Sequence, residues 1–165
     1  MKRILMIILL IMSCFLLQTT FFQAISFGGI VPNLLIVLTS AFGFMRGEKE
    51  GLFIGFICGL LCDICYGDIV GIQALIMMYI GFLNGKFSGI FYPEDIKLPM
   101  ALIIISNLSC GVVNYILMFL LRGRLNFSFY FQNIIIPEVV YTTVITLILY
   151  PIILKINMQL EAREK

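Results

Sequence analysis

Long apolar runs separated by short polar breaks make up almost the whole chain. Each break has a local cause: Pro32 follows a glycine pair at 28–29, residues 46–50 form a charged turn, and Pro93 opens the longest loop. The second and third runs are short for a hydrocarbon layer of about 30 Å, so we expect them to be little tilted or shielded by neighbours. The pattern predicts one all-α membrane domain over residues 1–165, a bundle of six transmembrane helices at approximately 4–25, 31–45, 51–66, 70–85, 98–121 and 131–155.

Glycine recurs at every fourth position along the third predicted helix. The series starts at Gly47, and the step after Gly59 reaches Asp63, an ionisable residue inside an apolar helix. Because residues four apart lie on nearly the same helix face, this face is reduced to bare backbone and lets a neighbouring helix come close. A second series with the same spacing ends at Gly89, after the fourth helix. The two helices are therefore expected to pack tightly through Gly51, Gly55, Gly59, Gly81 and Gly85.

Five polar side chains fall at a similar depth in the outer half of the predicted bundle: Gln18, Asn33, Asp63, Asn114 and Glu138. Such residues usually join membrane helices by hydrogen bonds worth about 0.6–2 kcal/mol each. At one depth they could instead line an outward-facing pocket. For the two acids, whose burial is expensive, a structural role, a binding role and simple solvation at a helix end all stay open. The inner half is expected to be almost wholly aliphatic.

Composition narrows the possible functions. Apolar residues make up 61% of the chain and charged residues 12%, against about 25% charged in soluble domains. No polar stretch is long enough for a separate soluble domain, and a net charge of +2 does not indicate nucleic-acid binding. Histidine is absent, which removes the commonest general base and metal ligand. Cys58, Cys62 and Cys65 are interpreted as small apolar residues, and no catalytic, cofactor or metal site is expected.

The distribution of Lys and Arg predicts the orientation in the membrane. With both termini in the cytoplasm, Arg122 and Arg124 are the two cations outside, and nine lie inside: Lys2, Arg3, Arg46, Lys49, Lys86, Lys97, Lys155, Arg163 and Lys165. The first apolar segment has no small-residue cleavage site, so we interpret it as a retained span and not as a signal peptide.

Several short motifs follow one another in the first half of the chain. They are Leu17-Gln18-Thr19-Thr20-Phe21-Phe22, Pro32-Asn33-Leu34-Leu35, and the glycine series with Gly55-Phe56, Gly59-Leu60-Leu61, Asp63, Gly71 and Gly81-Phe82. In order and spacing this set, over about residues 17–85, resembles the MreD family of bacterial rod shape-determining membrane proteins. The chain length and the six predicted spans agree with that resemblance.

The resemblance implies a non-enzymatic scaffold of the cell-wall elongation machinery, without a cofactor, in the bacterial inner (plasma) membrane. It implies binding to MreC and, through MreC, association with the MreB filament, the glycosyltransferase RodA and a penicillin-binding transpeptidase. The MreD fold is similar to the substrate-binding subunits of energy-coupling-factor vitamin transporters. A transporter subunit of that kind, with the five polar residues as pocket groups, is therefore the alternative hypothesis. A membrane-embedded enzyme is disfavoured because histidine and clustered acids are missing.

Overall fold

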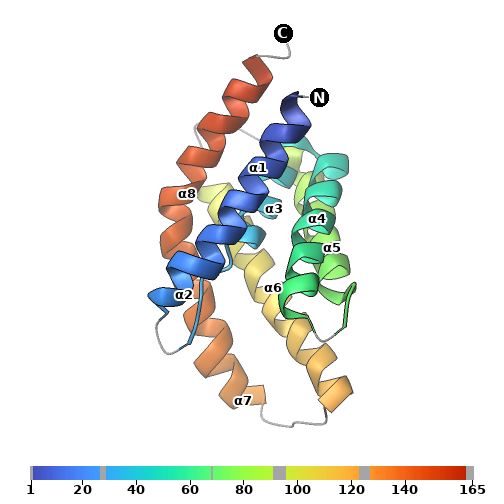
Figure 1. The fold of residues 1–165 in the computed structure, drawn as a ribbon, viewed down its shortest axis with the longest axis vertical. Helices are drawn as coiled ribbons and strands as arrows, with labels where there is room; N and C mark the ends of the chain where they lie inside the picture. Colours follow the sequence, from blue (N-terminus) through green and yellow to red (C-terminus); the bar gives the residue numbers. More distant parts are fainter. Residues whose placement is uncertain (1, 27–28, 68, 91–95, 123–126, 163–165) are drawn as a thin grey trace.

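A computed structural model describes residues 2–26, 29–67, 69–90, 96–122 and 127–162 as a helical bundle (Figure 1). The described residues form helices and no β-strand. The predicted break at Gly28, the loop at 93–95 and the cations Arg124, Arg163 and Lys165 lie outside the described residues. The elements are α1 (Lys2–Leu16), η1 (Leu17–Phe21), α2 (Phe22–Ala24), α3 (Leu34–Arg46), α4 (Glu48–Tyr66), α5 (Ile72–Lys86), η2 (Phe87–Ile90), α6 (Lys97–Arg122), α7 (Phe127–Tyr130), η3 (Phe131–Ile135) and α8 (Ile136–Ala162).

The helices run alternately up and down the bundle (Figure 1). The start of α1 and the end of α8 lie at one end, which we call the terminal end; α3 ends and α4 begins there, at Arg46 and Glu48. The opposite end, where α3 and α5 begin at Leu34 and Ile72, is called the capped end. Helix boundaries depart from the sequence prediction by up to seven residues, the most at the end of α8. α5, for example, begins only after Gly71, whose φ of +109° lies in the left-handed region that favours glycine.

Two helical stretches contain a π-helical turn, in which each hydrogen bond spans one extra residue. η1 lies between α1 and α2, and η3 between α7 and α8. Such turns change the helical register and are often found at functional sites. Both of these lie toward the capped end, where η1 contains Gln18 and η3 ends three residues before Glu138.

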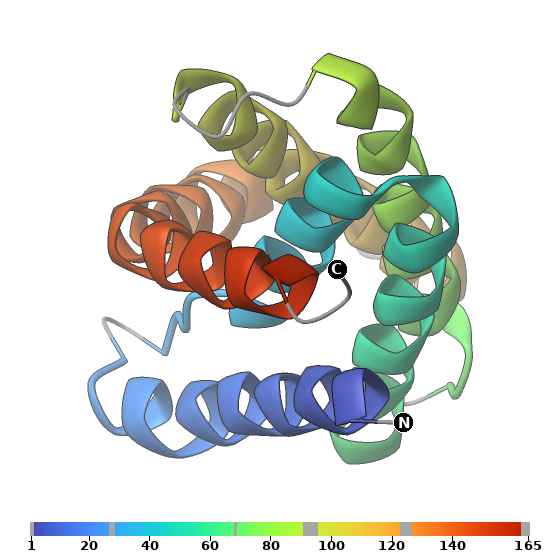
Figure 2. The same cartoon turned by 90° about the horizontal axis from the view of Figure 1, so that it is seen from above.

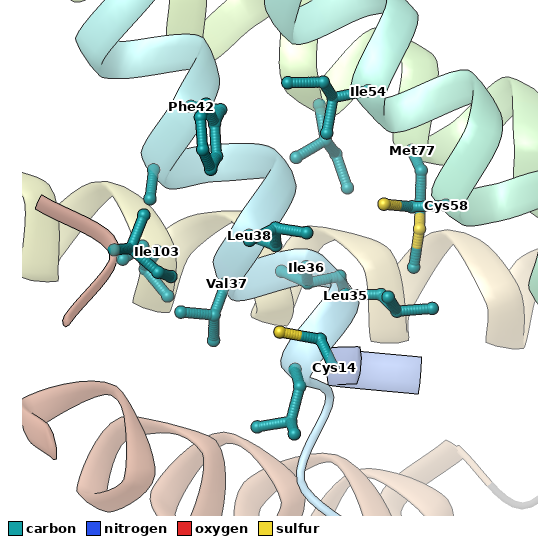
Figure 3. Packing of buried hydrophobic residues seen from close by; sticks show 14 of the residues in the cluster. Cys14, Leu35, Ile36, Val37, Leu38, Phe42, Ile54, Cys58, Met77 and Ile103 are labelled. Atoms are coloured by element: carbon teal, nitrogen blue, oxygen red, sulfur yellow. The ribbon is translucent and has the colours of Figure 1, made fainter. Parts of the chain in front are cut away.

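The short helix α3 occupies the centre of the bundle. Every residue from Leu34 to Met45 is buried, and the other helices surround α3 when the bundle is viewed from above (Figure 2). Figure 3 shows side chains of α3 pointing to different neighbours, among them Ile54 and Cys58 of α4 and Met77 of α5. A helix that is apolar all round lies either in a protein core or in lipid, and here the neighbouring helices enclose it. Because neighbouring helices shield α3, its length of about 20 Å does not have to match the hydrocarbon layer.

Among the described residues, three helical stretches combine the length and apolar composition that crossing a membrane requires: Ile4–Ala24, Lys97–Leu117 and Ser128–Gln159. Helix α3 is apolar but shorter. The chain is therefore an all-α membrane protein. The division into six separate crossings stays a prediction.

Candidate functional site

The α4–α5 hairpin is held together by glycines that face the backbone of the opposite helix. A Cβ atom at Gly51 would overlap the carbonyl oxygen of Gly81, and one at Gly81 would overlap the carbonyl of Gly51. A Cβ at Gly55 would overlap the carbonyl oxygen of Met77. The two backbones are thus in direct contact, which no larger residue at these positions allows without a shift of the helices.

The same contact continues toward both ends of the hairpin. A Cβ at Gly59 would lie 2.7 Å from the backbone nitrogen of Ala74, and one at Gly85 would lie 2.6 Å from the carbonyl carbon of Gly47. Gly89, by contrast, has no neighbouring atom within 4 Å of the position a Cβ would take. The close-packed part of the second series therefore ends at Gly85.

Gly43 of α3 belongs to this contact, and the sequence analysis missed it. A Cβ at Gly43 would lie 2.6 Å from the carbonyl oxygen of Gly81, and one at Gly51 would lie 2.7 Å from the Cα atom of Gly43. Three helices consequently meet at three glycines. The signal was present, because Gly43 is four residues before Gly47 and extends the same series backwards across the turn.

Asp63, near the end of α4, caps the start of α5. Its Oδ2 accepts hydrogen bonds from the backbone N–H groups of Gly71 and Ala74, both at 2.9 Å, and its Oδ1 accepts from that of Gln73 at 3.1 Å. Asp63 is 3% exposed. The first N–H groups of a helix have no partner inside the helix, and leaving them unpaired in a membrane is costly. The carboxylate also lies at the positive end of the α5 dipole.

The first N–H groups of α3 are buried, and two of them donate to a side chain of η1, the segment that follows α1. The Oε1 atom of Gln18, in η1, accepts from the N–H groups of Leu34 at 3.0 Å and Leu35 at 3.4 Å. These two groups belong to the first turn of α3, where no acceptor within the helix is available. Gln18 thus has the role that a capping side chain has, although it comes from another helix.

Asn33 and α8 complete the capping of α3. The Oδ1 atom of Asn33 accepts from the N–H of Ile36 at 3.2 Å, and the N–H of Asn33 donates to Oγ1 of Thr142 at 3.0 Å. Glu138, one helical turn before Thr142 on α8, lies close to the Asn33 side chain. Thr142 was missed because a hydroxyl within an apolar run gives no sequence signal of a distant partner.

Asn114 lies apart from the α3 cap. Its Nδ2 donates to Sγ of Cys110 on the same helix at 3.4 Å, and that sulfur also accepts from Nε2 of Gln73 at 3.4 Å. Gln73 is one of the residues whose N–H group is capped by Asp63. The predicted polar residues therefore form two neighbourhoods, one at the start of α3 with Gln18, Asn33 and Glu138, and one at the start of α5 with Asp63 and, through Gln73, Asn114.

The expectation of an almost wholly aliphatic inner half is wrong. Nδ2 of Asn84 on α5 donates to Oγ of Ser106 on α6 at 2.8 Å and to Oγ of Ser40 on α3 at 3.5 Å. Asn84 is buried, and its amide joins three helices on the half of the bundle toward the terminal end. Such links could not be predicted from the sequence, because each partner is a single polar residue in an apolar run on a different helix.

A second link in this half surrounds Arg46, the last residue of α3. Its Nε donates to Oδ1 of Asn157 on α8, and its Nη2 lies 3.5 Å from the Asn157 carbonyl oxygen. The Arg46 Nε is also 3.8 Å from Oε2 of Glu50 in the first turn of α4. The Arg46 side chain is 5% exposed. The sequence analysis used Arg46 only to predict the orientation in the membrane, but its contacts also join α3 to α4 and α8.

The thiols are all free, and Cys14, Cys58 and Cys110 are buried. Across the described ranges, His, Cys, Asp and Glu side chains form no group of three that could hold a metal ion. What the arrangement does chemically is to satisfy backbone groups and to bring helices into contact.

Comparison with known proteins bears on identity. A family model described as rod shape-determining protein MreD matches residues 1–160. No curated protein matches the chain, and no solved structure does so either. The family match covers both the glycine-packed hairpin and the two capped helix starts, as well as α6 and nearly all of α8. The chain therefore belongs to the MreD family, the rod shape-determining membrane proteins.

Proposed function

We propose that this protein is a non-enzymatic scaffold of the cell-wall elongation machinery in the bacterial plasma membrane. It binds MreC directly and, through MreC, is joined to MreB, RodA and a penicillin-binding transpeptidase. Membership of the MreD family supports a role in rod shape; the choice of partners is the part that we propose. The observation that carries the proposal is the direct backbone contact within the α4–α5 hairpin and between that hairpin and α3.

A scaffold has to hold its binding surfaces in fixed positions. Helices that touch through glycine have no long side chains between them that could change rotamer, and interfaces of this kind are closely packed. Gly43, Gly51 and Gly81 fix the centre of the hairpin against α3, and the links at Asn84 and Arg46 join the same helices to α6 and α8. Partner proteins would thus meet a surface of constant shape.

The two capped helix starts favour a scaffold over the alternative of a vitamin-binding subunit. A pocket needs polar groups that are available to a ligand. Here both carboxylate oxygens of Asp63 and the side-chain oxygens of Gln18 and Asn33 accept hydrogen bonds from the backbone. Their bonding capacity serves the fold, which argues against their use as pocket groups.

For orientation, we propose that the terminal end faces the cytoplasm. The exposed cations Lys49, Lys86 and Lys97 belong to the helix ends on that side, and Lys155 lies on the part of α8 that leads there. An excess of Lys on one side is the usual sign of the cytoplasmic face.

The test is purification of the full-length tagged protein from native membranes, combined with its depletion in a rod-shaped host. We expect MreC in near-equal amount, RodA and the transpeptidase in smaller amounts, and loss of rod shape on depletion. Recovery of a transporter ATPase with a tightly bound vitamin, with cell shape unchanged and vitamin uptake lost, would support the transporter alternative and contradict the proposal.

A further inference from the structure

The buried side-chain amide of Asn84 joins α3, α5 and α6, but one of its two polar atoms has no partner. Its nitrogen, Nδ2, lies 2.8 Å from the Ile80 carbonyl oxygen, 2.8 Å from Oγ of Ser106 and 3.5 Å from Oγ of Ser40. Its oxygen, Oδ1, is buried and accepts no hydrogen bond from the described residues. A buried carbonyl oxygen needs a donor, because the loss of its hydration is otherwise not compensated.

The orientation of this amide is fixed by its neighbours, so the unpaired oxygen cannot be removed by exchanging the two atoms. A backbone carbonyl can only accept hydrogen bonds, and rotating the amide by half a turn would place Oδ1 against the carbonyl oxygen of Ile80. The nitrogen carries two protons, and its two contacts at 2.8 Å use both of them. The hydroxyl of Ser40, at 3.5 Å, is therefore bound only weakly to the amide.

The two serine hydroxyls beside the amide have protons that are not used. Both hydroxyls accept from Nδ2 of Asn84, and neither donates to a group in the described part of the chain. Hydroxyls elsewhere in the bundle donate to a carbonyl of their own helix, as that of Thr143 does to Val139 at 2.6 Å. One unused acceptor and two unused donors thus belong to one cluster, formed by Ser40, Asn84 and Ser106.

A single water molecule has the size that is needed to connect these groups. The two polar atoms of the Asn84 amide are bonded to the same carbon, so Oδ1 is at most about 5.4 Å from Oγ of Ser106. Two hydrogen bonds of about 2.8 Å each, made to one water oxygen, span such a distance. Buried waters typically bond to about three polar groups, and the cluster offers that number.

The position of the cluster also favours hydration. Asn107, the residue after Ser106 on α6, is buried as well, and its Nδ2 is a donor without a partner among the residues that the structure describes. Asn84 lies two residues before Lys86, the last residue of α5, so the cluster belongs to the terminal end of the bundle. A water molecule therefore has only a short distance to travel from the membrane surface.

We propose that the cluster is a buried water-binding site between α3, α5 and α6. One water molecule donates to Oδ1 of Asn84 and accepts from the hydroxyl of Ser106, with the hydroxyl of Ser40 as its third neighbour. Water suits the cluster because it both donates and accepts, whereas a cation would be repelled by the N–H protons there and would find no negative charge on these three side chains. The attachment of α6 is thus partly water-mediated, unlike the direct backbone contact between α4 and α5.

Water-edited solid-state NMR of the full-length protein in lipid bilayers tests the site. In this experiment magnetisation passes from water protons to nearby protein groups, and we expect it to reach the side-chain amide of Asn84 at short mixing times. The internal control is the backbone amide of Leu38, which is fully buried in α3 and should receive magnetisation only at long mixing times. Absence of early transfer to the Asn84 amide would overturn the proposal.

A substitution that fills the site provides a second test. Ser106→Val replaces the hydroxyl by a methyl group and adds another, so we expect the early transfer to the Asn84 amide to be lost. The matched control is Ser109→Val, the same change at an exposed residue of the same helix, which should leave the transfer unchanged. Early transfer that persists in Ser106→Val, or that is lost in both variants, would overturn the proposal.

The same spectra distinguish water from a bound cation. Exchange of sodium chloride for choline chloride is expected to leave the chemical shifts of the Asn84 side chain unchanged, because water is present in both solutions. A shift that follows the sodium concentration would show that the cluster binds a cation, and would overturn the assignment to water.

Discussion

Replacement of Asp63 by alanine removes the acceptor for three backbone N–H groups at the start of α5. The groups belong to Gly71, Gln73 and Ala74, at 2.9, 3.1 and 2.9 Å from the carboxylate oxygens. Because Asp63 is 3% exposed, water does not readily replace it. The expected consequence is loss of stability together with fraying of the first turn of α5.

The size of the effect follows from the number of bonds. A hydrogen bond to a charged group contributes about 1.5–3 kcal/mol, and loss of an ordinary helix cap costs about 0.5–2 kcal/mol. Since the frayed turn relaxes and regains part of its hydration, we expect Asp63→Ala to lower the free energy of unfolding by about 3–5 kcal/mol. Asp63→Asn keeps one accepting oxygen, which can retain the bonds to Gly71 and Ala74, and turns an amide donor toward the N–H of Gln73. A loss of about 1–2 kcal/mol is expected for it.

The assay is equilibrium unfolding of the purified protein in detergent micelles by titration with a denaturing detergent. Amide hydrogen exchange at Gly71, Gln73 and Ala74 is measured in parallel, and exchange there should accelerate most in the alanine variant. Glu48→Gln is the control, because it removes an exposed negative charge without touching the cap. If Asp63→Ala cost less than about 0.5 kcal/mol and exchange at these amides did not change, the capping interpretation would be refuted.

Three further predictions use the same unfolding assay. Gly55→Ala should cost about 1–3 kcal/mol because its methyl group overlaps the backbone of α5, whereas Gly89→Ala, with open space around it, should be neutral; equal effects would count against the backbone contact. Gln18→Leu should cost about 1–3 kcal/mol because it leaves the first N–H groups of α3 without their acceptor, and a neutral result would mean that water reaches them. Asn157→Leu should cost a similar amount, about 1–3 kcal/mol, by removing a partner of the buried Arg46; if it costs nothing, α8 is not held at that point.

Features confined to one helix could be predicted from spacing. The four-residue glycine series indicated which face of the third predicted helix would lie closest to a neighbour, because helical geometry alone brings those positions together. Gly51, Gly55 and Gly59 do face the backbone of α5. Gly43 was not predicted. It has the same four-residue spacing, but it lies on the preceding helix, α3, on the other side of the charged turn from the rest of the series.

Roles that depend on contacts between helices could not be predicted in this way. The sequence singled out the polar residues as an unusual feature, but their spacing does not say which helix start each of them caps. Asn33 and Thr142 are 109 residues apart, and Arg46 and Asn157 are 111 apart. No pattern within one helix encodes such a pair, since either partner by itself looks like an isolated polar residue in an apolar run.

The sequence by itself therefore determined that the chain is helical and apolar enough for a membrane, and which helix face is bare backbone. Those properties follow from local periodicity and composition. Only the tertiary structure decided that α3 is the enclosed centre and that Asp63, Gln18 and Asn33 satisfy helix starts. The physical reason is that backbone N–H groups inside a membrane must find acceptors wherever packing brings them, and that packing joins residues from distant parts of the chain.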